Sequence, residues 1–287
     1  MKIRRDIAVI GMGNLGTSLA SALEAAGFST VRLHGRPSAK PADLQAQIAG
    51  ARILWLTVPD DAIGATALRL AQQPLGLRGR IVVHASGALG SDVLAAAETV
   101  GARIASVHPM MSFPTRRVVP LAGVRFAVEA ADLSARRELC RIVRRLGGQP
   151  FPISGDKKAL YHAGAMFGSP LLTALLSAGI GLLGEAGVPE KEARALLGAM
   201  AFATVENIRR RGPQQSFSGP LARGDASTIK LHRRALERHP LESDIYTALA
   251  RYAVRHLPSV HPRAISASLA ERGERKLGVA ERKRSRA

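Results

Sequence analysis

The sequence predicts an α/β domain built on a doubly wound parallel sheet, followed by an all-α domain. In the first half, short runs rich in Val, Ile and Leu alternate with helical patterns, as in parallel sheets that are covered by helices on both faces. In the second half, from about residue 156 to residue 256, no strand pattern recurs. The helical patterns there are interrupted only where glycine and proline cluster.

The composition is typical of a folded cytoplasmic protein. Hydrophobic residues make up 46% of the 287 residues and charged residues 22%, a balance found in globular chains. The single cysteine, Cys140, excludes an internal disulfide and is typical of a reducing compartment. We therefore expect a cytoplasmic protein whose stability comes from hydrophobic cores.

The chain is strongly basic, with a net charge of +19. Net charge alone affects solubility and non-specific association and does not identify a particular partner. Only 4% of the residues are aromatic, and no motif that reads nucleic acid accompanies the arginines. We interpret the charge as a solvated basic surface and do not expect nucleic acid as a partner.

Each expected strand of the first domain is a short apolar run. The strands are expected at residues 7–10, 30–33, 53–58, 81–84, 104–107, 124–128 and 149–153. The helices between them are expected at residues 15–26, 62–72, 91–100 and 133–146. The expected organisation is a sheet domain at 1–154, a helical domain at 155–257 and a basic, loosely ordered tail at 258–287.

One uncharged segment, residues 163–184, is long enough to span a bilayer. Glycine, serine and proline dilute its leucines, and no aromatic belt flanks it. We therefore expect a buried helix inside a soluble domain and no membrane association. Small residues along this helix permit close helix contact, so we also expect a homodimer through the helical domain.

A glycine motif lies between the first strand and the first helix. Residues 11–16 read Gly-Met-Gly-Asn-Leu-Gly, which matches G-x-G-x-x-G in the context that this motif requires. Gly11 permits the tight turn, Gly13 lets the backbone approach a pyrophosphate, and Gly16 lets helix and strand pack closely. Asn14 and Leu15 open the helix, whose free N–H groups attract phosphate. The sequence therefore predicts a Rossmann domain that binds a dinucleotide.

The residues after the second strand favour NADP(H) over NAD. An NAD-specific domain usually places Asp or Glu there for the ribose hydroxyls, and this chain has no acid between residues 33 and 40. Arg36 can instead make a forked contact to a 2′-phosphate, supported by Ser38 and Lys40. The alternative is that these three are ordinary loop residues.

Several polar residues follow the other strands, where ligands of open α/β sheets bind. We expect Val58, Pro59 and Ser86 to border the cofactor. We expect a substrate to meet His84, Ser86, Gly87 and His108. A simpler interpretation of Ser86-Gly87 is that these two residues only form a turn, since serine and glycine are common in turns.

Hydride transfer to a carbonyl or imine needs a nearby cation or proton donor. Lys158 is our first candidate because it opens the helical domain, and His162 lies on the same helix face four residues later. His108 is the second, as proton donor or as ligand of a substrate carboxylate. The alternatives are a surface lysine and a histidine bonded to the backbone. No spacing of metal ligands is present, and no metal is expected.

Arg223 and Asp225 lie in a loop marked by glycine and proline between helices. Arg223 can bind a substrate carboxylate while Asp225 holds the loop. A buried structural salt bridge is the alternative.

Four segments resemble motifs of one family, the Rossmann-like proteins with a DUF2520 C-terminal domain. They are residues 84–90 (HASGALG), 106–113 (SVHPMMSF), 158–163 (KALYHA) and 218–225 (SGPLARGD). Two positions depart from the family pattern: Ser218 replaces Thr, and Ser169 stands where an Asn is expected. The layout is similar to that of the 6-phosphogluconate dehydrogenase-like superfamily, with ketopantoate reductase, pyrroline-5-carboxylate reductase and prephenate dehydrogenase as relatives.

The resemblance implies an NADP-dependent oxidoreductase acting on a CH–OH or CH–NH group, with a lysine at the position of Lys158 and dimerisation through the helical domain. The leading hypothesis is reduction of a small carboxylate-bearing keto or imino compound, with a ketopantoate-like substrate first. Activities similar to those of pyrroline-5-carboxylate reductase or prephenate dehydrogenase are alternatives. A non-enzymatic, NADP-responsive binding or regulatory protein is the alternative from another class.

Overall fold

The structure, a computed structural model, describes residues 6–34, 46–74 and 76–270. The chain divides into two compact units, Met1–Ser169 and Pro170–Ala287. The first unit contains the sheet together with helix α6, which we expected to open the helical domain.

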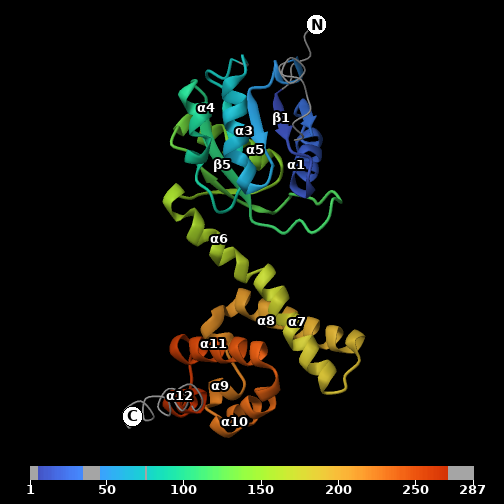
Figure 1. The fold of residues 1–287 in the computed structure, drawn as a ribbon, viewed down its shortest axis with the longest axis vertical. Helices are drawn as coiled ribbons and strands as arrows, with labels where there is room; N and C mark the ends of the chain where they lie inside the picture. Colours follow the sequence, from blue (N-terminus) through green and yellow to red (C-terminus); the bar gives the residue numbers. More distant parts are fainter. Residues whose placement is uncertain (1–5, 35–45, 75, 271–287) are drawn as a thin grey trace, which may run out of the picture. The chain divides into compact units, whose positions relative to one another are not determined.

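The first unit contains a seven-stranded sheet with the strand order β2-β1-β3-β4-β5-β6-β7 (Figure 1). The strands are β1 (Ile7–Ile10), β2 (Thr30–Leu33), β3 (Ile53–Leu56), β4 (Ile81–His84), β5 (Arg103–Pro109), β6 (Arg125–Glu129) and β7 (Gln149–Pro152). Each lies where the sequence places a strand, within two residues at either end. The predicted α/β class is therefore confirmed.

The direction of the last two strands differs from the expectation of a parallel sheet. The first five strands of the spatial order are parallel, but β6 runs antiparallel to β5, and β7 is parallel to β6. Residues 110–124, which join β5 to β6, contain no helix. A parallel neighbour needs a crossover connection, whereas a connection that simply returns along the sheet gives an antiparallel neighbour.

Helices cover both faces of the sheet, as Figure 1 shows. They are α1 (Asn14–Ala25), α3 (Asp60–Gln72), η1 (Ser91–Leu94), α4 (Ala95–Thr99) and α5 (Leu133–Arg145). Ile7 and Val9 of β1 pack in one core with α1 and α5, while Ala8 and Ile10 pack in a second core with α3 and α4. Alternate residues of a strand point to opposite faces, so a strand buried on both faces is apolar throughout.

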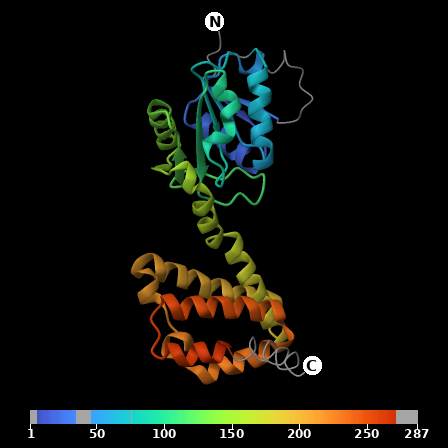
Figure 2. The same cartoon turned by 60° about the vertical axis from the view of Figure 1, so that its left-hand side comes forward.

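The second unit is helical throughout its described residues (Figures 1 and 2). The last helices of the first unit are η2 (Gly155–Lys157) and α6 (Lys158–Phe167). The helices of the second unit are α7 (Pro170–Glu185), α8 (Glu190–Ser216), α9 (Pro220–Arg223), α10 (Ala226–Ala235), η3 (Leu236–Arg238), α11 (Pro240–His256) and α12 (Pro262–Ala270). α8 is kinked at Gly212, whose φ of 78° is left-handed. The sequence predicts a break there from Gly212-Pro213.

Part of the expected loose tail is folded. α12 packs Ile265 and Leu269, which are spaced one helical turn apart, against Ile229 and Ala250. This small core holds α10, α11 and α12 together. The expectation of a loosely ordered segment is therefore wrong for residues 262–270.

The apolar segment 163–184 is helical, but it is not buried within the chain. None of the residues of α7 is buried, although α7 packs against α8. The helical stretch Gly155–Glu185 is long and apolar enough to cross a membrane, and its apolar window is 0% buried. The expectation of a helix buried inside a domain of the same chain is therefore wrong.

Candidate active site

The glycine motif forms a tight turn between β1 and α1. Gly11 has a φ of +108°, and a Cβ on it would lie 2.7 Å from the carbonyl oxygen of Thr57. A Cβ on Gly16 would lie 1.8 Å from the carbonyl oxygen of Gly11. The Thr57 hydroxyl donates a hydrogen bond of 2.5 Å to that same oxygen. Packing alone therefore requires glycine at Gly11 and Gly16.

Gly13 is different, because nothing in the protein requires it to be glycine. It is exposed, and a Cβ on it would meet no heavy atom of the described chain within 4 Å. It precedes α1, whose first turn has neither an acidic residue nor a side-chain cap among the described residues. Free N–H groups and the positive end of a helix dipole attract anions. Gly13 therefore borders open space at a helix end suited to phosphate.

The other predicted cofactor residues divide into two groups. Asn14 donates from Nδ2 to the carbonyl oxygen of Phe113 at 2.7 Å, which ties the start of α1 to the loop after β5. Leu15 packs against the core under α1. Arg36, Ser38 and Lys40, on which the prediction of NADP(H) depends, lie outside the described residues.

The loop after β4 is organised by its own hydrogen bonds. The Ser86 hydroxyl donates to Oδ2 of Asp60 at 2.7 Å and accepts from the backbone N–H groups of Ala88 and Leu89. Asp60 begins α3, directly after Val58, which is half-buried, and Pro59, which is exposed. Ser86 thus joins the ends of β3 and β4, beside the glycine motif.

His84 does not fit the predicted role of a substrate ligand. Its side chain is buried, Nε2 lies 2.9 Å from the carbonyl oxygen of Gly90, and Nδ1 accepts from the backbone N–H of Ser86 at 3.1 Å. Burial lowers the pKa of His84 to about 4, so the ring is neutral at ordinary pH. Because the chain itself uses both ring nitrogens, His84 shapes the loop, and we correct the prediction accordingly.

Lys158 is buried, not exposed to a cleft as predicted. Its side chain is 0% exposed, and Nζ donates to the carbonyl oxygen of Ser86 at 2.7 Å and to the hydroxyl of Ser106. Burial lowers the pKa of Lys158 to about 8, partly opposed by the carboxylates of Glu129 and Asp60. In this structure Lys158 therefore acts on its surroundings through charge and by holding the end of β4.

His108, at the end of β5, has a free ring nitrogen. Its Nδ1 lies 2.9 Å from the hydroxyl of Tyr161, and among the described residues Nε2 makes no hydrogen bond. Burial, with the charges of Lys158 and His162, lowers the pKa of His108 to about 4. Burial also raises the pKa of Tyr161 to about 12. A neutral histidine with one nitrogen held by a tyrosine is suited to donating or accepting one proton through the other.

Gly87 allows two histidines to meet. The rings of His108 and His162 are 5.7 Å apart between centroids, edge to face. A Cβ on Gly87 would lie 2.4 Å from Cδ2 of His162 and 2.8 Å from Nε2 of His108. The structure therefore brings together Lys158, His108, His162, Ser86 and Gly87.

Sequence reasoning did not identify Tyr161 and Glu129 as parts of this site, and it gave Asp60 no role there. Tyr161 follows Lys158 by three residues, so the helical spacing that relates Lys158 to His162 also places Tyr161 on that face. Asp60 follows the third strand at its carboxyl end. Glu129, which accepts from the N–H and hydroxyl of Ser91, carries no sequence signal of its own.

Arg223 and Asp225 lie in the second unit. Nε and Nη2 of Arg223 donate to Oδ2 of Asp225 at 3.0 and 2.8 Å. Their side chains are 65% and 36% exposed, so the pair is not the buried salt bridge of the alternative interpretation. Across the described residues, no group of three or more His, Cys, Asp or Glu side chains is placed to hold a metal ion.

Two family models match the chain. The Rossmann-like domain matches residues 1–109, and DUF2520, a domain of unknown function, matches residues 124–253. The chain joins a Rossmann-like domain to a DUF2520 domain. The resemblance seen in the four motifs is thereby confirmed. The DUF2520 match begins ahead of β6, so that β6, α5 and β7 fall within it.

No curated protein is significantly similar in sequence to this Rossmann-like/DUF2520 chain. Solved structures share its fold at low identity. One is a provisionally named NADP oxidoreductase from Bacteroides fragilis, with a TM-score of 0.69 and 20% identity over 87% of this chain and 98% of that one. A second is the reductive aminase from Aspergillus terreus in complex with NADPH and ethyl-5-oxohexanoate, with a TM-score of 0.64 and 18% identity over 94% of this chain and 99% of that one. A third is pyrroline carboxylate reductase from Plasmodium falciparum with NADP bound, with a TM-score of 0.59 and 16% identity over 93% of this chain and 96% of that one.

Proposed function

We propose that this chain is an NADP(H)-dependent oxidoreductase that reduces the C=O or C=N group of a small carboxylate-bearing keto or imino compound. The observation that carries the proposal is the succession of groups along one sheet edge. An exposed Gly13 at an uncapped helix start follows β1, and a half-buried His108 with a free Nε2 follows β5. β1 and β5 are parallel strands of one sheet, separated by β3 and β4, so both groups lie at the edge where open α/β sheets bind ligands.

The choice of NADP(H) over NAD rests on the sequence after β2. No acid is present there to hold ribose hydroxyls, and Arg36, Ser38 and Lys40 offer groups for a 2′-phosphate. The names of the Aspergillus and Plasmodium structures record NADPH and NADP, which is consistent with this choice.

When bound, NADPH supplies the hydride that reduces the substrate carbon. His108 stabilises the charge that develops on the substrate oxygen or nitrogen and gives up the proton on Nε2 to it. The Tyr161 hydroxyl passes its proton to Nδ1 of His108 in the same step, and the resting state returns when water protonates Nε2 and Nδ1 gives its proton back to Tyr161. Hydrogen bonding of Nδ1 to Tyr161 favours the tautomer with the proton on Nε2.

Lys158 supports this chemistry without touching the substrate. With a pKa of about 8 it is charged at neutral pH, and that charge helps to hold His108 neutral. Its hydrogen bonds fix Ser86 and therefore the loop that carries Gly87, against which both histidines pack. Lys158 is a positioning residue in this account.

The test is a screen of NADPH oxidation over keto acids, cyclic imines and, in reverse, hydroxy acids. We expect turnover of at least one compound by the wild-type protein, and loss of turnover in His108→Gln with coenzyme binding unchanged. Failure to oxidise NADPH with every class, in a protein that binds NADPH, would favour the NADP-responsive regulatory alternative.

We also propose that a second copy of the chain covers the apolar surface of α7 and α8 in a homodimer. Met200, Phe202 and Val205 of α8 are 65%, 77% and 52% exposed, and no residue of α7 is buried. Apolar surface of this extent marks an interaction site. A bilayer is a poor occupant, because α8, which packs against α7, carries the ion pairs Arg194–Glu190 and Arg209–Glu206. A soluble, cytoplasmic dimer fits these features.

A further inference from the structure

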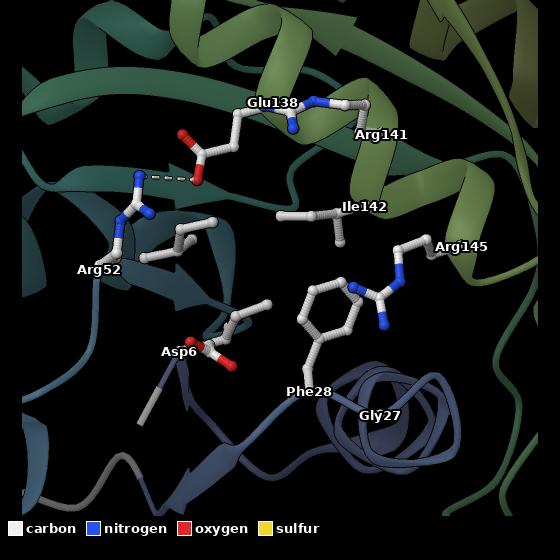
Figure 3. Close-up of a pocket in the computed structure, with 10 residues that line it drawn as sticks. Asp6, Gly27, Phe28, Arg52, Glu138, Arg141, Ile142 and Arg145 are labelled. Atoms are coloured by element: carbon white, nitrogen blue, oxygen red, sulfur yellow. Dashed lines mark hydrogen bonds and ion pairs between the residues drawn. The ribbon is translucent and has the colours of Figure 1, made fainter. Parts of the chain in front are cut away.

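A cavity lies at the opposite edge of the sheet from the glycine motif. It has a volume of about 460 Å³ and is bordered by the start of β1, the start of β3, the segment that follows α1, and helix α5 (Figure 3). Ligand pockets in proteins have volumes of about 300–1,000 Å³. The cavity is therefore large enough for a small molecule, and the proposed oxidoreductase chemistry does not use it.

The floor of this cavity is apolar and includes an aromatic ring. Ile142 of α5 is buried, and Phe28, which follows α1, is half-buried. The guanidinium of Arg145 lies 4.1 Å from the centroid of the Phe28 ring and donates to the carbonyl oxygen of Ala26 at 2.6 Å. Figure 3 shows the Arg145 guanidinium beside this ring. The contacts hold Arg145 in place, so little conformational freedom is lost when a ligand binds it.

The charges around the cavity leave two arginines without acidic partners. Glu138 pairs with Arg52 at 3.3 Å and lies 3.9 Å from a guanidinium nitrogen of Arg103, so its charge is already balanced. The carboxylate of Asp6 accepts from the backbone N–H of Ser29 at 3.4 Å. In the part of the chain that the structure describes, Arg141 and Arg145 form no ion pair. A bound anion would therefore meet the Arg145 guanidinium beside the Phe28 ring, with Arg141 on the lining of the same cavity.

We propose that this cavity binds a small aromatic carboxylate. A guanidinium accepts a carboxylate through two parallel hydrogen bonds, and Arg141 is placed to do so without first breaking an ion pair. A flat ring fits against Phe28 and Ile142 by offset or edge-to-face contact. A phosphate lacks a flat apolar face to lie against Phe28 and Ile142, which favours an aromatic carboxylate over a phosphate.

The test titrates benzoate into the full chain saturated with NADPH, with the methyl and aromatic resonances of Ile142 and Phe28 followed by NMR. Benzamide is the neutral match for benzoate, acetate lacks the ring, and inorganic phosphate tests for a simple anion site. We expect saturable shifts with benzoate, and binding weaker by about tenfold or more for the other three compounds.

Arg141→Gln is the decisive variant, because Arg141 forms no ion pair with any described residue and its loss should leave the fold intact. We expect benzoate affinity to fall about tenfold or more in Arg141→Gln. The matched control Arg137→Gln, an exposed arginine of the same helix away from this cavity, should bind benzoate as the wild type does. Absence of saturable shifts, equal binding of benzamide, or unchanged affinity in Arg141→Gln would each overturn the proposal. None of these readouts depends on turnover, so the outcome is independent of the oxidoreductase assay.

Discussion

Replacing Gly13 by alanine separates cofactor binding from the stability of the fold. The backbone at Gly13, with φ −78° and ψ −162°, is extended, and a Cβ there meets no described heavy atom within 4 Å. A Gly→Ala change in a compatible conformation stabilises by about 0.4–1 kcal/mol through the unfolded chain. Alanine is a poorer N-cap than glycine and offsets this gain by roughly the same amount. For a chain of this size we expect the Tm of the coenzyme-free protein to move by less than about 2 °C.

The same methyl group should obstruct the coenzyme. It would occupy the space through which the pyrophosphate approaches the N–H groups of α1. Loss of one charge-assisted hydrogen bond removes about 1.5–3 kcal/mol, which weakens binding by about 10–100-fold. NADPH at 100 times its Kd stabilises a protein by about 2.7 kcal/mol, and a 100-fold weaker site leaves about 0.4 kcal/mol. The Tm shift on adding NADPH should therefore fall from about 5–10 °C to about 1 °C.

Thermal unfolding with and without NADPH is the assay, and Gly16→Ala is the control. A Cβ on Gly16 would lie 1.8 Å from the carbonyl oxygen of Gly11, so this variant should lose about 2 kcal/mol or more of stability without any coenzyme. An undiminished Tm shift with NADPH in Gly13→Ala would refute the placement of the pyrophosphate. If the Tm of Gly13→Ala fell as much as that of Gly16→Ala, the conclusion that Gly13 borders open space would be refuted.

Three further predictions concern Lys158, acid stability and assembly. Lys158→Met removes a charge that lowers the pKa of His108, so the pKa of His108 should rise above about 4 in an NMR titration of its imidazole. Turnover should fall, and the affinity for NADPH should stay the same. An unchanged pKa of His108 would contradict the electrostatic role of Lys158. The pKa values of His84 and His108 are about 4 in the folded protein and about 6.5 in the unfolded chain. Between about pH 4 and pH 6.5 the unfolded chain therefore binds more protons than the folded protein. The free energy of unfolding should fall as the pH drops from about 6.5 to about 4. Urea unfolding across this range tests the sign, and a flat profile in the wild type, or one as steep in His108→Gln, would count against it. Phe202→Asp places a charge on a side chain that is 77% exposed, and we expect light scattering to show a monomer where the wild type is a dimer; a monomeric wild type would remove the dimer proposal.

The sequence allowed the sheet and the turn at the glycine motif to be predicted, because both are local features. Apolar runs mark the strands, and the glycine motif is specified by six consecutive residues at Gly11–Gly16. Strand direction is not local. β6 runs antiparallel because of the connection from β5, and its own residues resemble those of a parallel strand.

The contacts that define the site join distant parts of the chain. Lys158 reaches Ser106, 52 residues away, and Tyr161 reaches His108 across 53 residues. Position in the sequence made Lys158 a catalytic candidate but could not reveal that Ser86 and Ser106 enclose its amine. Basic composition likewise concealed α12, where Ile265 and Leu269 supply the apolar face of a short helix.

Titration calorimetry with NADPH and NADH tests the central claim most directly. The account predicts saturable binding of NADPH with an affinity about tenfold or more above that of NADH, equivalent to about 1.4 kcal/mol. The difference should shrink in Arg36→Ala, which removes the proposed contact to the 2′-phosphate. Absence of binding by either coenzyme, or equal affinity for both, would contradict the account.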